Sequence, residues 1–203
     1  MQRNPAFFWV SLKTHLLLSA TALGLALCFS LPVAILASRV LTIAPLAINL
    51  TNGLRVIPSL AILFLAYPYL GLGFFPAVVA ITILAIPPIL INTYAGFRNV
   101  PPDVLEAARG MGMSPAQVLR RIEFPLALPV ILAGVRTAAV EVIASATLAA
   151  FIGGGGLGDF MLRGFAVYDT RVMLAGAIPV ALLALLAEVV LTALQREYAL
   201  PAS

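Results

Sequence analysis

The segment EAARGMGMSPAQVLRRIEFP, residues 106–125, is a polar stretch set between long apolar runs. It carries two glutamates and three arginines, whereas residues 56–97 contain no charged residue. The whole chain of 203 residues is 62% hydrophobic and only 10% charged, while soluble domains carry roughly 25% charged residues. This composition cannot supply a water-exposed surface. It therefore predicts a protein whose main solvent is the bilayer, and it nearly excludes a soluble globular enzyme.

The apolar runs predict an all-α membrane protein with one transmembrane domain over residues 1–203, because a spanning helix needs about 20 mostly apolar residues. The stretch YPYLGLGFFP at 67–76 interrupts the longest run with Pro and Gly. The stretch IGGGGLGD at 152–159 must end another helix, since consecutive glycines do not sustain one. This glycine segment suits either a flexible outer gate or receptor contact, or an ordinary loop. About five spans are predicted, over residues 16–37, 43–67, 75–96, 127–150 and 172–194.

Lys and Arg near the span ends predict the orientation, because positive residues gather on the cytoplasmic side. One side holds Arg39, Arg98, Arg109, Arg120, Arg121 and Arg196, and the other holds Arg3, Lys13, Arg163 and Arg171. The bias places the 98–125 loop and the C-terminus in the cytoplasm and the N-terminus outside. The same flanking arginines explain the net charge of +4 without nucleic-acid binding.

Residues 99–125 are predicted to form a two-helix elbow. Pro101 and Pro102 suit a helix start, where a missing N–H costs nothing. Gly112 allows a sharp turn, and Ser114 with Gln117 has the spacing of a capping box that starts a second helix. This helix is expected to end at Phe124-Pro125. The elbow could be a surface loop that caps the membrane protein, or a docking element for a cytoplasmic partner.

Charged side chains inside apolar segments should face protein or water, because a charge facing lipid is costly. Arg55, Glu141 and Glu188 are such residues, and Pro58 loosens the helix that carries Arg55. They admit two interpretations, a gate or transport pathway and a structural ion pair between helices. A structural role is expected for Glu188. The pathway candidates are Asn52, Arg55, Pro58, Glu141 and Ser145.

The sequence does not contain the residues that a metal cluster or a phosphate-binding loop requires. One His, His15, and one Cys, Cys28, do not suffice for a metal cluster, so no metal site is predicted. The glycines of 153–156 lack the following Lys of a phosphate-binding loop. No bound cofactor and no catalytic residue are therefore predicted in this chain.

The polar stretch resembles the EAA loop of binding-protein-dependent ABC importer permeases. That pattern is Glu-Ala-Ala, three residues, Gly, nine residues, Ile, any residue, Leu-Pro, and here Phe124 replaces the Leu. The positions that match are Glu106, Ala107, Ala108, Gly112, Ile122 and Pro125. The resemblance extends over roughly residues 12–198.

Four further stretches are similar to the osmoprotectant branch of these permeases, which imports glycine betaine, carnitine, choline or proline-type solutes. They are IPSLAILFL (57–65), LGLGFFPAVVA (70–80), LPVILAGVRTA (128–138) and IGGGGLGD (152–159). The chain has Arg55-Val56 where that branch often has Gln-Thr. The chain therefore carries a cation where that branch often has two neutral polar residues.

The resemblance implies the fold of a type I importer permease and import by alternating access. Residues 101–113 would form a coupling helix in a cleft of a separate ATPase subunit, present in two copies, which binds ATP and Mg. The other implied partners are a second permease chain (the same or a sister chain), an extracytoplasmic substrate-binding protein and the lipid of a bacterial inner membrane. The alternatives are the same importer class with methionine, nitrate or a sulfonate as cargo, and a non-transporting membrane scaffold.

A quaternary ammonium cargo is attracted by aromatic faces. Aromatic side chains that could form such a cage, or that could form an interfacial belt instead, are Tyr67, Tyr69, Phe74 and Phe75.

Overall fold

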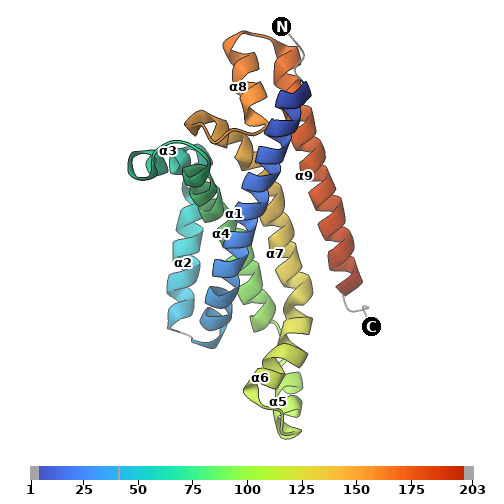
Figure 1. The fold of residues 1–203 in the computed structure, drawn as a ribbon. Coiled ribbons are helices and arrows are strands. Elements are labelled where there is room, and N and C mark those ends of the chain that lie inside the picture. The colour runs from blue at the N-terminus through green and yellow to red at the C-terminus, as the bar shows by residue number, and fades with distance from the viewer. Residues whose placement is uncertain (1–4, 41, 199–203) are drawn as a thin grey trace.

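The computed structural model describes residues 5–40 and 42–198, and these segments are helical with no β-strand among them (Figure 1). The α-helices are α1 (Pro5–Arg39), α2 (Ile43–Val56), α3 (Ser59–Leu70), α4 (Phe74–Arg98), α5 (Pro102–Gly110), α6 (Pro115–Val118), α7 (Phe124–Ser145), α8 (Gly158–Ala166) and α9 (Thr170–Tyr198). A π-helix (Leu119–Glu123) joins α6 to α7, and a 3-10 helix (Ala146–Ile152) follows α7. The predicted all-α membrane class is confirmed. Within the described residues, four helices are long and apolar enough to cross a bilayer, or five if α2 and α3 count as one span.

The core lies around α4, which packs against α1 on one side and α7 on the other. In its most apolar window, 61% of the residues of α4 are buried, against 11% for α9. Small residues bring α4 and α7 close together: a Cβ placed on Gly134 would lie 2.6 Å from the carbonyl oxygen of Pro88. The outer face of α9 is thus left for lipid or for another chain.

The bundle has two distinct ends. Figure 1 shows α5 and α6 projecting at one end, with α8 and the start of α1 at the other. The last turn of α9 lies toward the α5–α6 end. Arg3, counted above among the charges of the outer side, lies outside the described residues.

The first span is longer than expected. α1 begins at Pro5 instead of near residue 16, because residues 6–15 are mostly apolar and contain no helix breaker. Its first turns are held by α8, a short helix that the sequence analysis missed. Phe7 lies 5.1 Å from the ring of Phe160, and the guanidinium of Arg163 lies 4.2 Å from the centre of the Phe7 ring.

The segment predicted as the span over 43–67 consists of two helices, α2 and α3, with a break between them. α2 and α3 meet at an angle of 98°. Pro58 has no N–H, and its ring disfavours a helical conformation at the preceding residue, so Ile57 is extended with ψ 123°. The loosening predicted at Pro58 is a complete break.

The second helix of the elbow does not end at Phe124-Pro125, as was predicted. The chain is helical without interruption from Pro115 to Ile152, a length of 38 residues. Pro125 lies in the first turn of α7, directly after the π-helix. The wider π-turn shifts the hydrogen-bond register there, which accommodates a residue without an N–H. The second helix of the elbow, α6, therefore continues directly into the fourth span.

The glycine segment ends the helix as predicted, with Gly153 left-handed at φ +73°. It is packed and not free: Gly154 and Gly156 are buried. A Cβ on Gly156 would lie 3.3 Å from Nδ1 of His15. His15 is itself fully buried and donates from Nε2 to the carbonyl of Ile143 over 3.1 Å. The segment therefore serves as a close contact between α1 and the end of the fourth span.

Candidate functional site

The elbow of residues 99–125 is built by local signals in the sequence. α5 starts at Pro102, and Gly112 makes the turn with φ +79°. The predicted capping box is confirmed: the Ser114 N–H donates to Oε1 of Gln117 over 2.8 Å, and the Gln117 N–H donates to Oγ of Ser114 over 3.4 Å. The turn and the cap together hold α5 and α6 as two arms of one projection.

The EAA positions divide between two faces of the elbow. Glu106 and Ala107 are exposed, whereas Ala108 is 1% exposed and packs on its own chain. Met111 is 74% exposed. Within the described part of the chain, the Glu106 carboxylate has no hydrogen bond or ion pair, although Arg109 follows three residues later. The outer face thus presents an unpaired carboxylate beside small and apolar groups.

The other two positions of the motif lie at the root of the elbow. Ile122 is half-buried and belongs to the π-helix, and Pro125 is exposed at the start of α7. They are therefore placed to shape the junction with the span.

An ion pair that the sequence analysis missed anchors this root. Nη1 of Arg39, at the end of α1, donates to Oε1 of Glu123 over 2.8 Å, and Nη2 donates to the other carboxylate oxygen. The Glu123 side chain is 3% exposed and the Arg39 side chain 42% exposed. The sequence does show Glu123 as an acid within the otherwise apolar stretch 122–128. It does not show its partner, which lies 84 residues away. A two-pronged contact of this kind fixes orientation as well as position.

We expect the two partners to contribute unequally to stability. Arg39→Gln leaves a buried carboxylate unpaired and should cost about 2–3 kcal/mol, less than the roughly 3–5 kcal/mol for a fully buried pair because Arg39 is partly solvated. Glu123→Gln leaves a guanidinium that reaches water and should cost about 1 kcal/mol. Thermal unfolding in detergent measures both. The double variant should recover part of the loss, and strictly additive losses would contradict the coupling.

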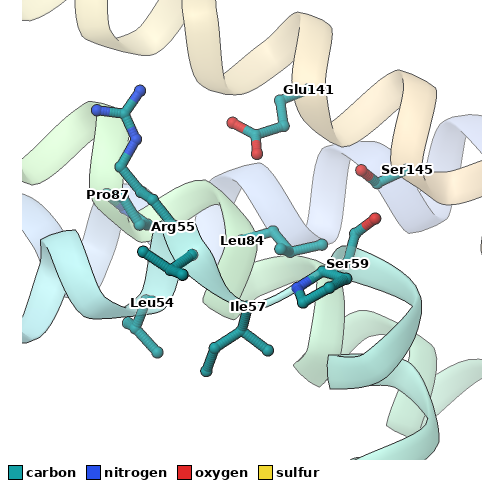
Figure 2. Close-up of a pocket in the computed structure, with 10 residues that line it drawn as sticks. Leu54, Arg55, Ile57, Ser59, Leu84, Pro87, Glu141 and Ser145 are labelled. Carbon is teal, nitrogen blue, oxygen red and sulfur yellow. The ribbon is translucent and has the colours of Figure 1, made fainter.

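A second group of residues surrounds a cavity at the break between α2 and α3, facing α4 and α7 (Figure 2). Its volume is about 370 Å³. Of the five pathway candidates, the structure brings together Arg55, Pro58, Glu141 and Ser145; Asn52 is exposed and does not line the cavity. The remaining lining residues are Leu54, Val56, Ile57, Ser59, Leu84 and Pro87.

The other intramembrane charges have a structural arrangement. Nε of Arg136 lies 3.5 Å from Oε1 of Glu188, and Nη1 of Arg136 donates to Oγ1 of Thr192 over 3.0 Å. These contacts join α7 to α9. Glu188 therefore does not belong to the cavity.

The four aromatic residues near the α3–α4 turn do not form a cage. Each is at least 41% exposed, and none makes a ring contact with another aromatic side chain in the described segments. Exposed rings near the end of the spans suit an interfacial belt. These residues are Tyr67, Tyr69, Phe74 and Phe75.

The described residues thus form a helical bundle with a projecting two-armed elbow and a cavity between its helices. The chain belongs to the family described as binding-protein-dependent transport system inner membrane component, whose profile matches residues 26–199. The resemblance drawn from the EAA positions is thereby confirmed.

Several permeases of similar length are related to this chain in sequence. It is 42% identical over 197 residues to the choline transport system permease protein OpuBB of Bacillus subtilis, covering 97% of this chain and 91% of that protein. It is 43% identical over 194 residues to the carnitine transport permease protein OpuCB of Listeria monocytogenes, covering 96% and 89%. It is 40% identical over 186 residues to the osmoprotectant import permease protein OsmW of Salmonella typhimurium, covering 89% and 86%.

Solved structures share the fold. The inward-facing MetNI methionine ABC transporter matches with a TM-score of 0.87 at 21% identity, over 98% of this chain and 100% of that one. A chain of an amino acid ABC transporter matches with a TM-score of 0.73 at 22% identity, over 96% and 93%. At this identity the likeness extends to the type I importer permease architecture and not to the cargo.

Proposed function

We propose that this chain is the transmembrane subunit of an ATP-driven importer of small osmoprotectants, with glycine betaine, choline, carnitine or a proline-like solute as cargo. The cargo class rests on relatives that are about 40% identical over nearly the whole chain. These relatives are choline, carnitine and glycine betaine transport permeases. The elbow supports the coupling, because its outer face presents the unpaired Glu106 to a partner.

The chain itself supplies no catalytic group in this proposal. ATP and Mg are bound by a separate ATPase, in two copies, and each copy receives one elbow through residues 101–113. A second permease chain, the same or a sister, completes the pathway, and the sparsely buried α9 leaves surface for that chain or for lipid. An extracytoplasmic binding protein delivers the cargo. The elbow and the C-terminus face the cytoplasm of a bacterial inner membrane, and the N-terminus faces outward.

The continuous helix from Pro115 to Ile152 is the proposed lever. ATP binding draws the two elbows together and tilts the attached spans, because α6 continues through the π-helix into α7 without a break in the helical segment. Glu141 and Ser145 of the cavity lie on the same helix. Movement at the elbow therefore changes access to the cavity, and hydrolysis resets it.

Uptake by the reconstituted complex tests this proposal. The chain, its ATPase and its binding protein are assembled in proteoliposomes, and uptake of radiolabelled glycine betaine, choline, carnitine and proline is measured with and without ATP. We expect ATP-dependent uptake of at least one of them. Uptake of only methionine, nitrate or a sulfonate would overturn the cargo class, and no uptake of any solute by an assembled complex would favour the scaffold alternative.

A further inference from the structure

We propose that the cavity at the α2–α3 break binds the cargo inside the membrane, and that it is built for a zwitterion. The carboxylate end would lie at Arg55 and the start of α3, and the quaternary ammonium end at Glu141. This proposal rests on the proposed function above. It adds a binding site in the permease itself, and it assigns one end of the cargo to each charged residue.

The two opposite charges are held apart across the cavity. Figure 2 shows the Glu141 carboxylate pointing from α7 toward the break, with the Arg55 guanidinium across the same space. The ion pairs within residues 5–40 and 42–198 are Arg39–Glu123 and Arg136–Glu188, so Arg55 and Glu141 do not neutralise each other directly. The charge of Arg55 acts on Glu141 across the cavity without a direct ion pair, and both residues are exposed, so their charged groups remain open to water or a ligand. A solute with one positive and one negative end satisfies both residues at once.

The break adds a second group that favours an anion. α3 has 12 residues and begins at Ser59, and its first internal hydrogen bonds run from Ala61 and Ile62 to the Pro58 carbonyl. The N–H groups of Ser59 and Leu60 therefore have no acceptor within the helix, and the positive end of the helix dipole lies there. Pro58 and Ser59 both line the cavity. Interrupted helices present such ends to carboxylate groups of cargo in other transporters.

Ser145 is an independent sign of a polar ligand. It is only 9% exposed, and its hydroxyl is directed toward the cavity (Figure 2). Within the described part of the chain this hydroxyl makes no hydrogen bond. The hydroxyl oxygen is accessible from the cavity, so a bound solute or its water would hydrogen-bond to it.

The size and the apolar walls suit a small methylated solute. A volume of about 370 Å³ is at the lower end of the usual range for ligand pockets. Apolar side chains provide contacts for methyl groups beside the two charges. They are Leu84 and Pro87.

Comparison of three probes separates binding from a structural role. Glycine betaine and carnitine carry a carboxylate and a quaternary ammonium, whereas choline carries only the ammonium. Equilibrium binding of each labelled probe is measured on the permease–ATPase complex in nanodiscs, without the binding protein and up to high millimolar concentration. Arg55→Gln should weaken glycine betaine and carnitine by about tenfold or more, the loss expected for a charge-assisted hydrogen bond. It should leave choline nearly unchanged, whereas Glu141→Gln should weaken all three.

Matched variants distinguish a loss of binding from misfolding. Arg55→Lys should recover part of the glycine betaine affinity, and Arg171→Gln and Glu197→Gln, which make the same charge changes on exposed residues outside the cavity, should bind like the unmodified complex. Assembly with the ATPase is checked for every variant. Equal losses for all three probes in Arg55→Gln would overturn the assignment of ends.

The outcomes separate this site from the proposed function. If the unmodified complex binds none of the probes but still imports them with its binding protein, the site proposal falls and the importer stands. If the complex imports none of them, the cargo proposal falls, whatever the binding measurement gives.

Discussion

Glu106→Arg is expected to abolish association of the ATPase while the membrane fold survives. Glu106 is exposed and makes no hydrogen bond or ion pair within the described residues, so under the proposed docking its hydrogen bonds would come from the ATPase. An arginine there replaces an acceptor by a donor and places a cation in a cleft that receives a carboxylate. Mismatched charges at a docked interface cost several kcal/mol. Co-purification with a tagged ATPase should fall below detection, and ATP-dependent uptake should fall with it.

Glu197→Arg is the matched control for this prediction. Glu197 is exposed near the end of α9, and the same charge reversal there lies outside the elbow. It should leave both co-purification and uptake unchanged. Retained co-purification and uptake in Glu106→Arg would count against the docking role of the elbow, and equal losses in both variants would indicate a nonspecific effect of charge.

Gly134→Leu is expected to prevent stable packing of the bundle. The Cβ alone would lie 2.6 Å from Cβ of Asn92 and 2.6 Å from the Pro88 carbonyl oxygen, and the second contact is with backbone that cannot rotate away. Accommodating the side chain requires separation of α4 and α7, which both contribute to the core. We expect a loss of about 3 kcal/mol or more, at the upper end for overpacking. The yield of monodisperse protein and its unfolding temperature in detergent measure this.

Gly24→Leu tests whether the effect of Gly134→Leu comes from the close helix contact at residue 134 and not from replacing any glycine in a span by leucine. Gly24 also lies within a spanning helix, but a Cβ there meets no atom within 4 Å. This variant should fold normally, because a leucine is a better helix former than glycine and is compatible with lipid. A folded Gly134→Leu protein with unchanged stability would show that α4 and α7 are not in close contact at this point.

Local patterns in the sequence were sufficient for much of the fold. The uninterrupted apolar runs predicted spans over 75–96 and 172–194, and α4 and α9 occupy nearly the same residues. The capping box was predictable because both of its hydrogen bonds join residues three apart. Proline predicted a disturbance at residue 58, but the bend of 98° depends on how α3 packs against α4 and the end of the fourth span.

The two candidate sites differ in how far the sequence could predict them. Glu106 and Gly112 lie in one short segment, and their arrangement follows from a turn and a cap. The cavity combines Arg55 and Glu141 from distant helices, and nothing along the chain excluded Asn52 from it. Helix phase and packing decided which polar side chains of α2 face the cavity and which face outward.

Composition, the length of the apolar runs and the local turn and cap signals determined that this chain is a helical membrane protein with a polar elbow, because the bilayer permits only segments whose backbone is hydrogen-bonded internally. Tertiary structure decided that Arg39 meets Glu123, that Arg136 meets Glu188, and that Arg55 and Glu141 remain apart across a cavity. The physical reason is that the same charges on the same helices can pair or remain separated. Which of these occurs depends on helix rotation and on close contacts at glycines such as Gly134, which involve residues far apart in the chain.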